Sequence, residues 1–194
     1  MPAWHHWYHC MANTFGTWLP GDPRGFRTKH HREHAEGDYK NPPPAGKYDG
    51  LHTAAQNKMR RPPIVLNTSA QRSALVAIVA IVEAFGFHHI EFLCAAVSNE
   101  HLHVLARFEP RDGVADPPRH YLGIAKKQSA KALVAAGLAE PGGVWARKGK
   151  IVPITDRSHQ VNVFRYIQRH AQQGAAVWTF KDQQSDSPQD NTHG

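Results

Sequence analysis

The pattern of hydrophobic and polar positions along this chain predicts strands and helices that interleave. Residues 7–18 (WYHCMANTFGTW) are rich in aromatic residues and Thr and predict a first strand, which ends at the turn sequence of residues 19–23. Residues 88–98 and 101–108 predict two further strands joined at residues 99–100, which form a hairpin. Residues 144–154 (VWARKGKIVPI) predict a fourth strand or hairpin, and a short segment, AAVWTF, lies near the end.

Apolar positions at helical spacing predict three helices. The first begins at Thr68, which forms a capping box with Gln71, and ends at Gly86. The second spans Leu122–Ala136. The third spans Ser158–Gln173, with Asp156 or Ser158 as its cap.

This order of elements predicts an α+β fold of ferredoxin-like or RRM-like type, an antiparallel sheet with helices packed on one side of it. Residues 24–63 show no steady periodicity and predict a long insertion after the first strand, with a short helix near Thr53–Arg60. We expect one domain over residues 1–180 and a polar, disordered tail over residues 181–194.

Composition narrows the class of protein. The formal net charge of +7 favours anionic partners, nucleic acid first. Two cysteines, Cys10 and Cys94, exclude a disulfide framework and a four-thiolate zinc site. The chain shows neither a signal-peptide pattern nor a membrane-spanning apolar run, so we expect a cytoplasmic protein without a membrane partner.

The segment SNEHLHVLARF places two histidines in a predicted strand. His101 and His103 are two residues apart and therefore project from one face, while Leu102 and Val104 project from the other. Two imidazoles at this spacing can bind one divalent ion. Taken alone, the pattern is more often a pair of half-exposed histidines on the solvent face of a sheet.

A second histidine-bearing segment, FRYIQRHAQQG, changes this balance. Tyr166 and His170 are four residues apart on a predicted helix and share one face. His170 offers a third imidazole, and Tyr166 beside a metal is a candidate nucleophile. Since a free phenol ionises only near pH 10, its attack at neutral pH would need a polarised phosphate and nearby cations.

These residues resemble a known family. VSNEHLHVLARF is similar to the histidine-hydrophobe-histidine (HUH) motif of single-tyrosine transposases of the insertion sequence 200/605 group, and FRYIQRHA resembles their tyrosine-bearing helix. The opening YHCMANTFGTWLPGDPRGF resembles a bacterial subgroup that includes the REP-associated tyrosine transposases. The resemblance covers most of residues 7–180, weakly in the insertion.

The resemblance implies a metal-dependent HUH endonuclease and strand transferase that acts on single-stranded DNA, with a hairpin as its target, in DNA transposition and recombination. His101 and His103 would bind Mg²⁺ or Mn²⁺, and Tyr166 would form a 5′-phosphotyrosine intermediate. His170 stands where many members carry Gln or Asn as the third ligand. The family also implies a homodimer, and a bacterial, nucleoid-associated location in the cytoplasm.

Basic residues supply a candidate DNA-binding surface. A positive track with aromatic stacking surfaces is what single-strand binding needs, and the candidates are Lys126, Lys127, Lys131, Arg147, Lys148, Lys150 and Arg165. Trp18, Trp145 and Trp178 are candidates for stacking, with core packing as the default. For the histidines of residues 5–9 we favour ordinary strand and terminal positions over a separate metal site.

Two rival functions are consistent with the same residues. One is a non-catalytic, RRM-like module that binds single-stranded nucleic acid, whose histidines are incidental. The other is a zinc-dependent hydrolase that uses His101, His103 and His170 around an open coordination position.

Overall fold

The computed structural model describes residues 4–24, 26, 44–85 and 90–185. The chain divides into two compact units, one formed by Met1–Asn13 together with Leu66–Gly194 and the other by Thr14–Val65. The first unit carries nearly all of the sheet and the candidate metal, nucleophile and basic DNA-binding residues, whereas the stacking candidate Trp18 lies in the second.

Within the described residues, the sheet has five strands in the order β4-β1-β3-β2-β5. Strand β3 is central and pairs antiparallel with both β1 and β2, and β2 also pairs antiparallel with β5. The antiparallel α+β fold expected from the sequence is thus confirmed. The strands are β1 (Trp7–Thr14), β2 (Ile90–Val97), β3 (His101–Phe108), β4 (Trp145–Pro153) and β5 (Ala176–Thr179).

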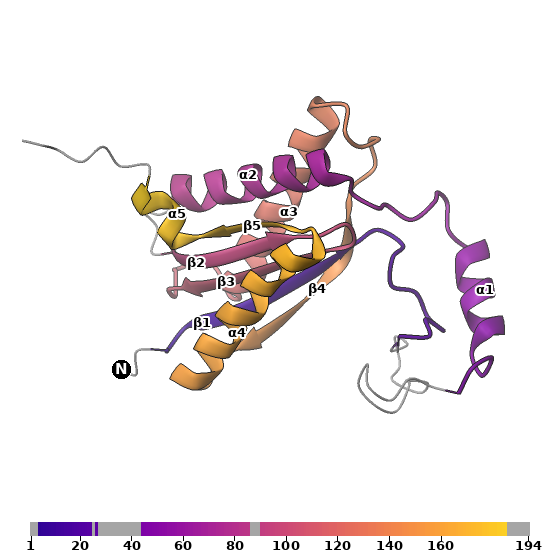
Figure 1. The fold of residues 1–194 in the computed structure, drawn as a ribbon, viewed down its shortest axis with the longest axis horizontal. Coiled ribbons are helices and arrows are strands. Elements are labelled where there is room, and N and C mark those ends of the chain that lie inside the picture. Colours follow the sequence, from indigo (N-terminus) through magenta and orange to yellow (C-terminus); the bar gives the residue numbers. More distant parts are fainter. Residues whose placement is uncertain (1–3, 25, 27–43, 86–89, 186–194) are drawn as a thin grey trace, which may run out of the picture. The chain divides into compact units, whose positions relative to one another are not determined.

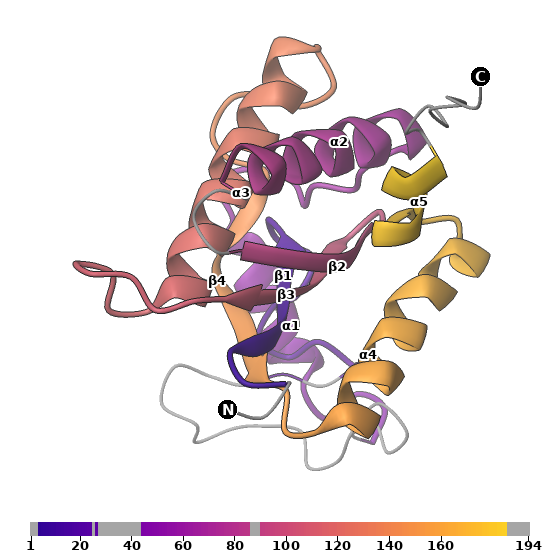
Figure 2. The ribbon, with the colours of Figure 1, turned by 90° about the vertical axis from the view of Figure 1, so that its left-hand side faces the viewer.

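Helices cover both faces of this sheet, whereas the sequence led us to expect helices on one side. Helices α2 (Thr68–Phe85) and α3 (Pro117–Ala135) pack together on one face, and α4 (Arg157–Arg169) lies on the other against β2, β3 and β5 (Figures 1 and 2). A 3-10 turn (His170–Gln173) and the short helix α5 (Phe180–Ser185) follow at the C-terminal side.

Strand β3 supplies apolar side chains to both layers. Leu102 and Val104 are buried on the side of α2 and α3, as expected, and Leu105 lies in a buried cluster on the side of α4 with Val163 and Ile167. Full burial of an aliphatic side chain such as Ile167 stabilises the fold by about 1.5–3 kcal/mol. The face of β3 that carries the histidine pair is therefore also apolar at Leu105, and helix α4 covers this apolar part.

The starts of two helices differ from the expected ones. The side chain of Asn67, rather than a capping box at Thr68, accepts a hydrogen bond from the Ala70 N–H (2.9 Å). Helix α3 begins five residues earlier than predicted, because Pro117 fits the first turn of a helix and Asp116 caps it by accepting from the Arg119 N–H.

The second unit contains helix α1 (Asp49–Asn57), slightly before the predicted short helix. In its loop, the Asp22 carboxylate pairs with the Arg24 guanidinium at 2.8 Å, and the same guanidinium lies 4.6 Å from the centre of the Trp18 ring. Residues 25 and 27–43 of the expected insertion and residues 186–194 of the expected tail lie outside the described residues. None of the described helices is long and apolar enough to cross a membrane.

Candidate metal centre

The central strand positions the first two histidines. His101 begins β3 and His103 follows on the same face, and their neighbours across the sheet are Asn13 and Met11 of β1. His103 is 6% exposed, while His101 is half-buried. The pair is thus held by a strand that is hydrogen-bonded on both sides, which limits its movement.

Helix α4 brings Tyr166 and His170 to this face. The Asp156 carboxylate caps the helix by accepting from the His159 N–H at 2.8 Å, and Val163 and Ile167 anchor it on the sheet. Tyr166 precedes the buried Ile167 and is 42% exposed. His170 follows the last residue of α4 and is 4% exposed.

The three predicted imidazoles lie together. One ligand nitrogen from each of His101, His103 and His170 lies within 4.8 Å of the other two. Three nitrogens bound to one ion at about 2.1 Å lie roughly 3–4 Å apart, so small side-chain rotations bring these to bonding distance. Such a group can hold a divalent ion and leave coordination positions open.

The tautomer of His170 is set by the helix itself. Its Nδ1 lies 3.0 Å from the backbone carbonyl oxygen of Tyr166. A carbonyl oxygen only accepts, so Nδ1 carries the proton and donates it. The lone pair of His170 therefore resides on Nε2, which is the arrangement a metal-binding imidazole needs.

A fourth histidine belongs to the cluster, and sequence reasoning missed it. His9 of β1 is 8% exposed, and its Nε2 lies 3.0 Å from Nδ1 of His103. The sequence pattern predicts an ordinary strand position for His9, and His9 does lie in β1, but the pattern does not indicate its contact with His103. His9 lies two residues before Met11, so the two side chains project from the same face of β1, and Met11 is the neighbour of His103 on β3. The spacing can be seen in the sequence, but the contact with His103 follows only from the register of β1 against β3.

Burial keeps this pair neutral. Desolvation lowers the pKa of His103 to about 2, with further contributions from the neighbouring His9, His170 and His101. Desolvation likewise lowers the pKa of His9 to about 4, and the charges of His159, Lys150 and His170 add to this. Both rings are therefore uncharged at neutral pH, so their lone pairs remain available for a hydrogen bond or a metal.

The candidate nucleophile lies against these rings. The centre of the Tyr166 ring is 4.7 Å from that of His170, 5.4 Å from that of His103 and 6.0 Å from that of His9. All four residues come from one chain. A second subunit is not needed to bring them together, although the family resemblance implies a dimer.

The candidate DNA-binding residues occupy three places. Lys126, Lys127, Lys131 and Arg147 line a pocket between α3 and β4. Lys148 and Lys150 are exposed on β4, and the effect of Lys150 on the pKa of His9 places its charge near the histidine cluster. Arg165 is exposed on α4 and lines a separate cavity of about 380 Å³.

The tryptophans differ in accessibility. Trp145 is 8% exposed, and its indole N–H donates to Ser129 Oγ at 2.9 Å. Trp178 is half-buried and its ring lies 4.9 Å from that of Phe92. Trp18 is 46% exposed, although Arg24 lies over its ring. The buried Trp145 thus follows the default of core packing, with one edge in the pocket.

Comparison with known proteins assigns no family to this chain. No protein-family model matches it, and no curated protein matches its sequence. Among solved structures it is similar to a REP-associated tyrosine transposase bound to a REP hairpin, with a TM-score of 0.47 and 13% identity over 89% of this chain and 70% of that chain. A likeness of this size assigns no activity, so the chemistry of this chain rests on its own side chains.

Proposed function

We propose that this protein is a metal-dependent endonuclease and strand transferase of single-stranded DNA, with Tyr166 as its nucleophile. One observation carries the proposal: three imidazoles and a tyrosine from two distant segments converge in one chain. If these rings served only to pack the core, an exposed phenol beside three candidate metal ligands would have no role.

The donor set fits a divalent ion. His170 presents Nε2, and His103 is neutral, so two of the three ligands are already in the binding form. Imidazole nitrogens suit Mn²⁺ better than Mg²⁺, which prefers oxygen ligands, so we expect Mn²⁺ to bind more tightly. The bound ion supplies Lewis-acid polarisation of a phosphate oxygen.

His9 holds His103 in the required orientation. When Nε2 of His103 binds the ion, its Nδ1 carries the proton and donates it to Nε2 of His9, which is neutral and accepts. An outer hydrogen bond of this kind fixes both the ring angle and the tautomer of a metal-binding histidine. Burial of both rings keeps water from competing for this bond.

Tyr166 performs the covalent step. Its phenolic oxygen attacks the phosphorus of a phosphodiester, the bond to the 3′ oxygen breaks, and a 5′-phosphotyrosine forms. The proton lost by the phenol is balanced by the proton gained by the leaving 3′ oxygen. A free 3′-OH can reverse the step, so strand transfer in DNA transposition would need no external energy source. Lys150, whose charge acts on His9, provides a cation near this site.

The substrate class follows from charge and from the chemistry. The net charge of +7 and the exposed cations of α3, β4 and α4 favour a DNA strand with an accessible phosphate. By the same family resemblance we propose a hairpin-bearing strand in the bacterial cytoplasm as the target. A homodimer remains part of this proposal, although the three histidines and the tyrosine of the proposed site lie together in one chain.

A cleavage assay tests the proposal. A hairpin-bearing single-stranded oligonucleotide, labelled at either end, is incubated with Mn²⁺ or Mg²⁺, and covalent adducts are resolved on a denaturing gel. We expect an adduct that carries the 5′-phosphate fragment. Tyr166→Phe should abolish the adduct and retain DNA binding, whereas Tyr8→Phe, on the same sheet and half-buried, should keep both.

Three outcomes contradict the proposal. An adduct in Tyr166→Phe would move the nucleophile elsewhere. DNA that is bound but never cleaved, with or without metal, would support the non-catalytic module. Intact DNA together with one zinc ion per chain would support the hydrolase.

A further inference from the structure

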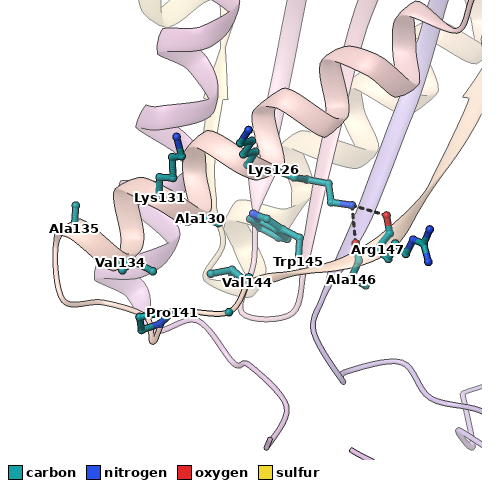
Figure 3. A pocket seen from close by; sticks show the side chains of 13 residues that line it. Lys126, Ala130, Lys131, Val134, Ala135, Pro141, Val144, Trp145, Ala146 and Arg147 are labelled. Atoms are coloured by element: carbon teal, nitrogen blue, oxygen red, sulfur yellow. Dashed lines mark hydrogen bonds between the residues drawn. The ribbon is translucent and has the colours of Figure 1, made fainter. Parts of the chain in front are cut away.

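The pocket between the C-terminal half of α3 and the start of β4, called the hollow from here on, has none of the clustered histidines in its lining. Its volume is about 620 Å³, within the range of small-molecule sites. Its apolar wall comes from Ala130, Val134, Val144 and Trp145, and Figure 3 shows the Trp145 ring between the helix and the strand.

The rim of this hollow is positively charged. Lys127 and Lys131 are exposed and four residues apart, so they share a face of α3, and Arg147 lies across from them on β4. Like charges at this helical spacing repel and destabilise a helix slightly, and a bound anion would relieve this. Among the described residues that line the hollow, none is acidic.

The wall is rigid. The Trp145 indole is fixed by its hydrogen bond to Ser129 Oγ, which in turn donates to the Ala125 carbonyl oxygen at 2.7 Å. Lys126 ties the strand to the helix, because its ammonium donates to the carbonyl oxygens of Ala146 at 2.6 Å and Arg147 at 3.1 Å (Figure 3). The hollow is thus already formed, with an apolar interior and a cationic edge.

Strand β4 connects this hollow to the histidine cluster. It is one of the two edge strands of the sheet, and the N–H of Ile154, one residue past its end, donates to the Trp7 carbonyl oxygen of β1 at 2.8 Å. Arg147 lines the hollow, whereas the charge of Lys150 acts on His9. Arg147 and Lys150 are separated by about 10 Å of strand and project from opposite faces of β4, with the exposed Lys148 between them. An anionic polymer that leaves the hollow therefore follows these cations around the edge of β4 toward the candidate active site.

We propose that this hollow binds one unstacked nucleotide of the DNA strand whose backbone passes around the edge of β4 to the histidine cluster. The nucleobase lies against the wall of Trp145 and Val134, and the flanking phosphates pair with Lys127, Lys131 and Arg147. The inference rests on the proposed function for the identity of the ligand, but not on cleavage. The occupant is amphipathic and anionic, which a nucleotide is and an apolar peptide is not.

The test compares a filled hollow with a missing base. Binding of a dye-labelled single-stranded 20-mer to the full chain is measured by anisotropy in EDTA, for the intact strand and for strands with an abasic site at each position in turn. Ala130→Phe fills the hollow without changing charge, and Val76→Phe adds the same ring at an exposed position of α2.

For the wild-type chain, we expect one abasic position to weaken binding by about 10-fold, the usual effect of a lost base contact. Ala130→Phe should weaken binding of the intact strand by about the same factor and leave that abasic strand unaffected, while Val76→Phe changes neither. Equal weakening of both strands by Ala130→Phe, or no weakening, overturns the proposal.

A charge variant decides the question even if Ala130→Phe misfolds. Lys131→Gln should reduce the slope of log affinity against log salt by about 0.7, the value for one phosphate contact on a single strand. Arg72→Gln, an exposed cation of α2, should leave the slope unchanged. An unchanged slope in Lys131→Gln overturns the inference. Adduct formation at Tyr166 is scored separately, so the two proposals can fail independently.

Discussion

Acidification should destabilise the metal-free protein through the buried His9–His103 pair. The folded-state pKa of His9 is lowered from 6.5 to about 4, mainly by desolvation. The unfolded chain therefore binds a proton that the folded chain does not bind between these two pH values. The contribution of neutral His9 to the free energy of unfolding is fully present above pH 6.5 and is lost as the pH falls toward 4.

The magnitude follows from the two pKa values. Between pH 7 and pH 5, His9 alone should lower the free energy of unfolding by about 2 kcal/mol, and the full difference of pKa corresponds to about 3 kcal/mol. His103, whose pKa is lowered further, acts in the same direction. A loss of this size is a large part of the stability of an ordinary domain.

Urea denaturation at pH 7, 6 and 5 in EDTA measures this loss. His9→Gln removes the titrating group and should flatten the pH dependence, whereas His120→Gln, at an exposed position of α3, controls for the loss of a histidine as such. A free energy of unfolding that is constant between pH 7 and pH 5 would refute the reasoning. So would a steeper dependence in His9→Gln than in the wild-type chain.

Two further substitutions test the packing that supports the site and the hollow. A Cβ at Gly149 would lie 2.7 Å from the Met11 carbonyl oxygen and 2.8 Å from Leu122. Gly149→Ala should therefore lower the urea midpoint by the equivalent of about 1–3 kcal/mol. An unchanged midpoint would contradict this. Ser129→Ala leaves the buried Trp145 N–H without its acceptor. The free energy of unfolding should fall by about 1–3 kcal/mol in the same assay, with a change in tryptophan emission. An unchanged free energy would show that another acceptor replaces the hydroxyl.

Local patterns predicted the elements well, because periodicity and turn residues act over a few neighbouring positions. The strand over residues 101–108 and the stop at Gly174, with φ of +81°, are both in the structure. The helix predicted to run to this stop ends earlier, at Arg169, and residues 170–173 form a 3-10 turn. The boundaries that were wrong depended on side-chain choices between near-equivalent caps, such as Asn67 against Thr68. The second helical layer was missed because the apolar stripe of α4 does not say which face of a sheet it covers.

The alternation of a strand and the turn of a helix were enough to place His101 with His103 and Tyr166 with His170, since both are properties of a single element. The meeting of these two pairs was a hypothesis from their chemistry, which the family resemblance strengthened, because it depends on how α4 packs on β3. His9 shows the remaining limit. Its bond to His103 depends on the register of β1 against β3, which is set by the whole sheet and by the apolar side chains that each face must bury.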